Sequence, residues 1–157
     1  FSRLIPHPPN FTPIIAMGLF ASAYIKDKRI ALLIPLLAML LADTFLGFYG
    51  IIYWVYGSLI IISCIGILLK NRTNLMNCTT AALGSSLIFF LITNFGVWFM
   101  GGFYEKSLMG FLTCYAMALP FFLNTLAGSI FYSVIMFGGY EGLKHYFPDT
   151  ASDSILK

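Results

Sequence analysis

The chain has 157 residues, of which 59% are hydrophobic and only 10% are charged, whereas about 25% of residues are charged in an average soluble domain. This composition excludes a soluble globular, a disordered and a fibrous protein. The charges are also unevenly placed, because residues 30–69 carry only Asp43, and residues 73–104 and 107–140 carry none. Since about 20 apolar residues cross a bilayer, the sequence predicts an all-α, multi-pass membrane helix bundle.

Apolar runs and the residues that interrupt them predict about six transmembrane segments. Thr12 and Pro13 open the first as N-cap and first helical residue, and Asp27 is the expected N-cap of the second. In the last apolar stretch, Pro120 is expected to break the helix, with Asn124 capping the helix that follows. The predicted segments are residues 12–25, 30–49, 51–69, 79–100, 107–121 and 123–140, all within one domain (1–140), followed by a polar tail (141–157).

Lysine and arginine are concentrated in two of the expected loops, 26–29 and 70–78. The positive-inside rule places such loops in the cytoplasm. Residues 1–11, 101–106 and 141–157 are then expected on the outer side, and the expected location is the bacterial inner (cytoplasmic) membrane. The chain begins at Phe1 rather than at a methionine, so the sequence leaves open whether a further helix or a signal peptide precedes it.

Asp43 is the single ionisable residue inside the predicted spans. Such a residue is costly in hydrocarbon and by default marks a functional site or a pairing role. At 1.5 Å per residue, Asp43 and Asn94 both lie about 9 Å from the outer ends of their segments. Two polar residues at one depth predict a polar pocket that opens to the outside. The alternative is that Asp43 stabilises the bundle by capping a neighbouring helix.

Further candidate site residues lie near the same outer end. The prolines between Arg3 and Pro13 predict an extended segment on the outer face. Trp98 and Tyr104 flank the Gly101-Gly102 pair, where they form either an aromatic belt at the lipid interface or a wall for a flat ring. The complete predicted substrate-binding set is His7, Asn10, Asp43, Asn94, Trp98 and Tyr104.

The first predicted segment is rich in small residues, such as Gly18 and Ser22. Small residues four apart allow another helix to approach closely. The sequence does not decide whether that helix belongs to this chain or to another membrane subunit.

Several kinds of site are absent from the sequence. Two histidines and three cysteines provide neither a metal cage nor a disulfide framework. There is no glycine-rich phosphate loop, no zinc-binding helix and no nucleophile elbow, so we expect no enzyme, no cofactor and no metal. The net charge of +3 is scattered, which excludes a nucleic-acid surface. The expected partners are the lipid bilayer, a small-molecule ligand and other membrane subunits.

Several motifs resemble those of a family of uncharacterised small bacterial integral membrane proteins. They are RLIPHPPNFTP (3–13), LAD (41–43), TNFGVW (93–98) and ALPFFxNTxxG (118–128). More distantly, the pattern is similar to the S components of energy-coupling-factor vitamin transporters. That resemblance implies a bundle of about six helices that binds a vitamin or another metabolite from outside.

Two functions are compatible with these patterns. In the first, the protein captures or transports a small metabolite from the outer side, as an S component does. In the second, it is a non-catalytic accessory subunit of a larger bacterial membrane complex. The first function requires Asp43 and Asn94 to meet at a cavity, whereas in the second they form hydrogen bonds within the bundle.

Overall fold

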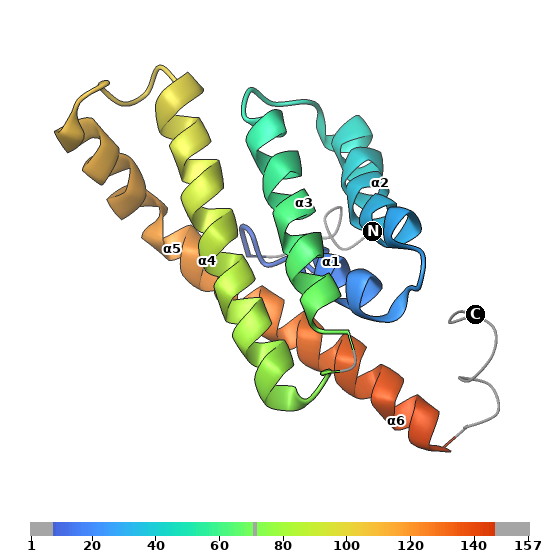
Figure 1. The fold of residues 1–157 in the computed structure, drawn as a ribbon. Coiled ribbons are helices and arrows are strands. Elements are labelled where there is room, and N and C mark those ends of the chain that lie inside the picture. The colour runs from blue at the N-terminus through green and yellow to red at the C-terminus, as the bar shows by residue number, and fades with distance from the viewer. Residues whose placement is uncertain (1–7, 71, 147–157) are drawn as a thin grey trace.

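A computed structural model describes residues 8–70 and 72–146, and all regular secondary structure in these two ranges is helical (Figure 1). This confirms the all-α part of the predicted fold class. The helices are α1 (Ile14–Tyr24), α2 (Lys28–Leu46), α3 (Ile52–Leu68), α4 (Leu75–Met100), α5 (Leu108–Ser133), the π-helical turn η1 (Val134–Gly138) and α6 (Gly139–Tyr146).

The first helix, α1, is a core helix rather than a span. Eight of its 11 residues are buried, and Figure 1 shows it in the middle of the bundle, surrounded by longer helices. At 1.5 Å per residue it is about 16 Å long, roughly half the thickness of a bilayer's hydrocarbon core. It begins after Pro13 without a side-chain cap, so the N-cap expected at Thr12 is wrong. A helix that protein surrounds on every side has no need of a polar face.

The small residues of α1 face α3 of the same chain. A methyl group added at Gly66 would lie 2.7 Å from the backbone oxygen of Leu19 and 2.8 Å from the Cβ atom of Ser22. From the other side, a methyl group at Gly18 would lie 3.3 Å from Ile62. The two helices therefore touch almost backbone to backbone, as small residues four apart allow.

The break predicted at Pro120 is absent, so the separate segments 107–121 and 123–140 are wrong. Helix α5 continues through Pro120, and Asn124 lies inside it. In a membrane, a turn at this depth would leave several backbone groups without partners, which costs more than the one hydrogen bond that proline removes. Packing on α4 also supports the continuous helix, since the hydroxyl of Tyr115 donates to Leu91 O at 2.7 Å.

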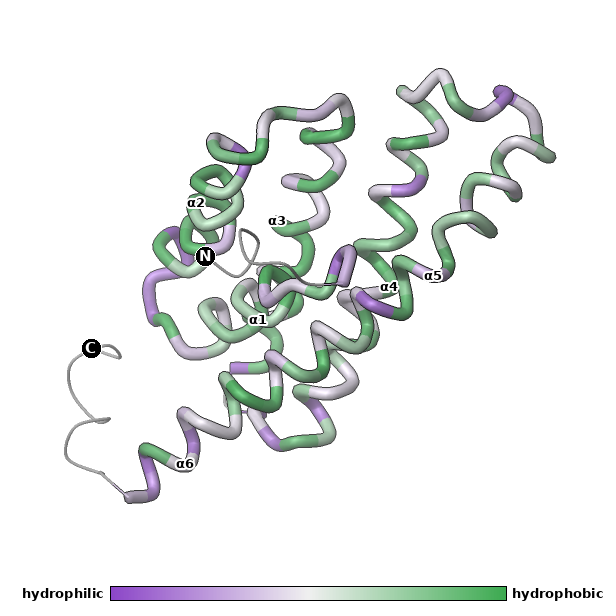
Figure 2. The backbone as a smooth tube through the Cα atoms, turned by 180° about the vertical axis from the view of Figure 1, so that it is seen from behind, coloured by the Kyte–Doolittle hydropathy of each residue, from purple (hydrophilic) through white to green (hydrophobic). Residues whose placement is uncertain are grey.

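Three helical stretches are long and apolar enough to cross a membrane: Lys28–Leu46, Leu75–Met100 and Leu108–Tyr146, the last comprising α5, η1 and α6. Helices α1 and α3 are shorter, so the described residues do not form the six predicted spans. Large apolar side chains point outward from the long helices, for example Leu41, Leu91 and Leu119. Hydrophobic residues occupy much of the length of these helices (Figure 2), and such residues suit contact with lipid chains.

The loops gather at two ends of the bundle. At one end, the hydroxyl of Tyr24 donates to Glu141 Oε1 at 2.6 Å, and that of Thr73 does so at 3.4 Å, which joins α1, the α3–α4 loop and α6. At the other end, the loops after α2 and α4 share a cavity lined by Gly50 and Gly101. The start of the predicted tail, including Glu141, therefore lies at the same end of the bundle as the 70–78 loop. The prediction had put the two at opposite ends, and it is wrong for this part of the tail because α5 has no break at Pro120.

This arrangement sharpens the charge asymmetry. Six of the seven lysines and arginines in the described ranges lie in or beside the loops at the Glu141 end: Lys26, Lys28, Arg29, Lys70, Arg72 and Lys144. Only Lys106 lies at the other end. We call the first the basic end and the second the opposite end.

Two local predictions are confirmed. Asp27 caps α2 by accepting a hydrogen bond from the backbone N–H of Arg29 at 2.8 Å. Gly47 and Gly50 leave so short a link between the second and third predicted segments that the sequence predicts an antiparallel hairpin. Helices α2 and α3 form this hairpin (Figure 1). Gly47 ends α2 with a φ of +91°, a conformation that glycine adopts at little cost.

Candidate functional site

A cavity of about 360 Å³ lies between the N-terminal segment, α2, α3, α4 and α5. Two of the six predicted site residues, Asn10 and Asn94, line it. The other lining residues were not predicted; they are Met39, Tyr49, Ile51, Val55, Phe89, Phe90, Thr93, Val97, Ala118, Phe121, Phe122 and Thr125. We call this space the central cavity.

Asn94 presents its amide oxygen as a free acceptor. Its side-chain nitrogen donates to Phe90 O, one turn earlier, at 2.8 Å. The side-chain oxygen has no partner within the described ranges. Thr93 and Thr125 also bond to the carbonyl one turn back on their own helices, a pattern that satisfies a hydroxyl inside an apolar helix. The polar part of the wall is thus held by local bonds and stays in place without a ligand.

Asn10 reaches the cavity through a tight turn. The N–H of Phe11 donates to Pro8 O at 3.0 Å, which puts Pro9 and Asn10 at the central positions of a β-turn. Asn10 has a φ of +64°, in the left-handed region that asparagine tolerates better than most residues. The described part of this segment, residues 8–13, is therefore turned, and the prediction of an extended segment is wrong for these residues. Residues 3–7 of the predicted segment lie outside the described residues.

Gly128 on α5 holds this segment in place. A methyl group there would lie 3.1 Å from Thr12 N and 3.2 Å from the Cα atom of Phe11. The ring of Phe11 packs against Phe131 and Tyr132, with centroids 5.7 and 5.6 Å apart. The start of the described chain is thus fixed to the last long helix.

Asp43 lies beside the central cavity but is not part of its wall. Its side chain is fully buried, and its Oδ2 atom accepts hydrogen bonds from the hydroxyls of Tyr56 at 3.0 Å and Tyr49 at 3.5 Å. Tyr49 does line the cavity. Asp43 therefore positions a wall residue and links α2 to α3, whereas the sequence had left open a place on the pocket wall or a helix cap.

The other predicted site residues lie apart from this cavity or outside the described ranges. The indole nitrogen of Trp98 donates to Glu105 O at 2.9 Å, its ring packs on Phe111, and Lys106 Nζ lies 5.5 Å from the ring centroid. Trp98 thus fastens the loop at the opposite end, on which Tyr104 also lies. Neither residue lines the central cavity. His7 falls outside the described residues.

A polar cluster at the basic end was missed by the sequence analysis. Tyr24 and Thr73 donate to Glu141 from two different parts of the chain. Two effects raise the pKa of Tyr24 above its usual range: burial of the phenol, which is the larger, and its hydrogen bond to Glu141. The phenol therefore keeps its proton and serves as a donor. The only sequence signal was the isolated position of Glu141 after a long uncharged stretch.

The wall of the central cavity determines the chemistry that it can accommodate. Aromatic rings from three segments, Tyr49, Phe90 and Phe122, provide flat apolar surfaces, and the amides of Asn10 and Asn94 provide donors and acceptors. Among the residues that the structure describes, the wall has no charged side chain. Its volume lies near the lower end of the range for small-molecule sites. The cavity thus suits a small, neutral ring system with hydrogen-bonding groups.

The sequence matches one described family. The model of a "Family of unknown function (DUF6580)" matches residues 1–150. No curated protein matches the chain, and no solved structure does.

Proposed function

The chain belongs to the Family of unknown function DUF6580, and we propose a function for it from the geometry of the central cavity. The protein is a non-catalytic, multi-pass protein of the bacterial inner membrane. It captures a small, neutral, ring-containing metabolite in this cavity from the non-cytoplasmic side.

The observation that carries this proposal is that Asn10 and Asn94 both line one cavity of about 360 Å³. These residues are far apart in sequence, and the cavity joins them to aromatic rings on α4 and α5. A purely structural bundle would gain about 25 cal/mol for every Å² of apolar surface that it buried by filling this space. Side chains that are held in place around an unfilled space are typical of a preorganised binding site.

Capture from outside is also the activity that the distant resemblance to S components implies. Two observations support capture from outside. One is the sequence pattern, and the other is that Tyr49 and Ile51, in the loop at the opposite end, line the cavity. The accessory-subunit alternative loses one of its arguments, because the small-residue face of α1 is already occupied by α3 of the same chain. We therefore favour the binding function.

The orientation gives the first test. We expect single cysteines at positions 28, 72 and 144 to be shielded from a membrane-impermeant maleimide in intact cells, and one at position 105 to be labelled. The reason is the concentration of lysine and arginine at the basic end. The measurement uses a background without Cys64, Cys78 and Cys114. Labelling of position 28 from outside would reverse the orientation and the side from which the cavity fills.

Substitution of Asn94 tests the binding function. In the Asn94→Leu variant, a molecule that co-purifies with the wild-type protein should be lost, because the free acceptor is removed and the cavity is partly filled. Native mass spectrometry of protein extracted in mild detergent measures the bound mass. We expect the affinity to fall by about tenfold or more, the value of one buried hydrogen bond and its desolvation.

Thr113→Leu is the matched control for this experiment. Thr113 is an exposed polar residue of α5 that bonds to Met109 O on its own helix and does not line the central cavity. This variant should retain the bound molecule. Equal loss from both variants, or no bound molecule from wild-type protein expressed in its own host, would rule against capture.

A further inference from the structure

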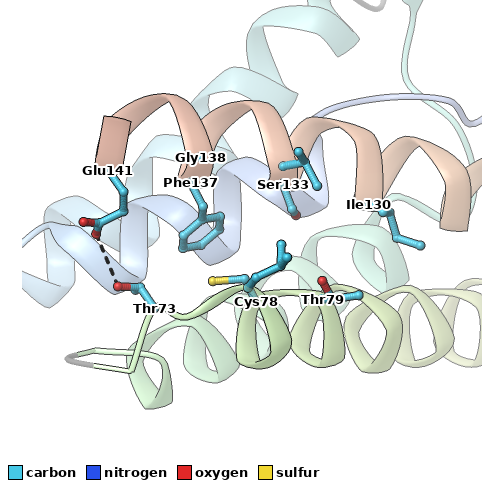
Figure 3. A pocket seen from close by; sticks show the side chains of 10 residues that line it. Thr73, Cys78, Thr79, Ile130, Ser133, Phe137, Gly138 and Glu141 are labelled. Carbon is cyan, nitrogen blue, oxygen red and sulfur yellow. Dashed lines mark hydrogen bonds between the residues drawn. The ribbon is translucent and has the colours of Figure 1, made fainter. Parts of the chain in front are cut away.

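A second cavity, of about 190 Å³, lies at the basic end between the start of α4 and the C-terminal helix (Figure 3). Its wall is formed by Thr73, Leu75, Cys78, Thr79, Ile130, Ser133, Val134, Phe137, Gly138 and Glu141. It shares no residue with the central cavity. We call it the inner cavity.

Ser133 presents an unpaired polar atom to the inner cavity. The residue is only 4% exposed, and its hydroxyl oxygen has no hydrogen-bond partner within the described ranges. Figure 3 shows the side chain directed toward α4, across the space from Cys78. A buried hydroxyl without a partner costs free energy, so its position on a cavity wall points to a partner that is supplied from outside the chain.

Glu141 provides the second polar group. Its Oε1 atom accepts from Tyr24 and Thr73, whereas Oε2 accepts from neither. Within the described ranges, Glu141 has no other hydrogen bond. The two hydroxyls orient the carboxylate, and one oxygen remains free to accept from a cation at the mouth of the cavity.

The π-helical turn brings these two groups to the same face. Residues eight apart in a regular α-helix are separated by about 80° around the axis. Because η1 takes up one additional residue in its turn, Ser133, Phe137 and Glu141 all face α4 and line one cavity. Along the axis, Ser133 and Glu141 lie about 12 Å apart at roughly 1.5 Å per residue.

From this geometry we propose that the inner cavity binds a short, linear amino alcohol. The ammonium group pairs with the free oxygen of Glu141, the apolar chain lies against Phe137, and the hydroxyl bonds to Ser133. The largely apolar wall between the two polar groups excludes a ligand that is charged along its length. This site is independent of the central cavity and of its proposed ligand.

Three probes of equal chain length separate the two ends of the site: 6-aminohexan-1-ol, n-hexylamine and hexan-1-ol. Calorimetric titration of the full chain in detergent gives their affinities. We expect 6-aminohexan-1-ol to bind about tenfold or more tightly than either of the others, because each of them lacks one hydrogen-bonding end. Equal affinity for 6-aminohexan-1-ol and hexan-1-ol, which lacks only the ammonium group, would overturn the role of Glu141.

Variants then assign each end to its residue. Ser133→Ala should abolish the advantage of 6-aminohexan-1-ol over n-hexylamine, and its melting temperature without a probe should be unchanged or higher, because an unpaired hydroxyl is removed. Glu141→Gln should abolish the advantage of 6-aminohexan-1-ol over hexan-1-ol. Glu105→Gln, which alters an exposed acid at the opposite end, should leave all three affinities unchanged.

Partition of the probes into micelles is measured with Ser133→Leu, a variant that fills the inner cavity. Its titration should show only a weak, unsaturable background for all three compounds. If this variant binds the probes as the wild-type protein does, they bind to detergent or elsewhere on the surface, and the proposal is wrong.

Discussion

Gly66→Ala is expected to destabilise the protein by about 1–3 kcal/mol, the usual cost of adding a methyl group to a packed interior. The new methyl group would lie 2.7 Å from Leu19 O and 2.9 Å from the Cα atom of Leu19. These are backbone atoms of α1, which cannot move aside as a flexible side chain can. The helices α1 and α3 would have to separate along their whole contact. Thermal unfolding in detergent, followed by circular dichroism, measures the loss.

Gly57→Ala provides a control of opposite sign on the same helix. A methyl group at Gly57 meets nothing within 4 Å. Alanine is favoured over glycine inside a helix by about 0.5–1 kcal/mol, so this variant should unfold at the same temperature as the wild type or at a higher one. Similar destabilisation by both substitutions would show that helix packing at Gly66 is looser than described.

Asp43→Leu is expected to have the second large effect. The substitution leaves the hydroxyls of Tyr56 and Tyr49 without the acceptor that they now share. An orphaned polar group that is largely shielded from water costs about 1–3 kcal/mol. Asp43→Asn keeps an oxygen at the same place and should cost much less. The melting temperatures should therefore fall in the order wild type, Asp43→Asn, Asp43→Leu.

Two tyrosines of α3 provide the control for this prediction. Tyr56→Phe should lower the stability by about 1 kcal/mol or more in the wild-type background, and by much less in Asp43→Leu, where the bond is already lost. Tyr53 is 79% exposed, so Tyr53→Phe should have little effect in either background. If Tyr56→Phe costs the same with and without Asp43, the carboxyl group does not support this tyrosine.

The sequence was sufficient to predict the helical fold because long uncharged stretches have few alternatives. It also identified the Asp27 cap and the α2–α3 hairpin, which depend on local residues. Pro120 misled the analysis because its effect depends on the surroundings: in water proline ends a helix, whereas packing against α4 supports the helix through it. Residues 12–25 were predicted to be a transmembrane segment, although burial among other helices explains an apolar segment equally well.

The candidate site was only partly predictable for a related reason. Asn10 and Asn94 were identified because polar residues near apolar segments are conspicuous. Tyr49, Phe90 and Phe122 were missed, because an aromatic residue on a cavity wall has the same sequence pattern as one that faces lipid. Trp98 was assigned to the site from its position near a helix end, yet its indole bonds to Glu105 O. Whether an aromatic side chain faces a cavity, lipid or a loop depends on how its helix is rotated in the bundle, and no local sequence pattern determines this rotation.

The contact between the N-terminal segment and Gly128 also sets the order in which the protein can be assembled during synthesis. Helix α1 leaves the ribosome before α2 and α3, but it is too short to span the bilayer and has to wait until these two helices enclose it. Residues 11 and 12 reach their place only when α5 has been inserted, more than 110 residues later in the sequence. The wall that carries Asn10 thus closes last. A chain that stalls before α5 therefore has an open, unfinished central cavity, and only a fully translated molecule can hold a ligand there.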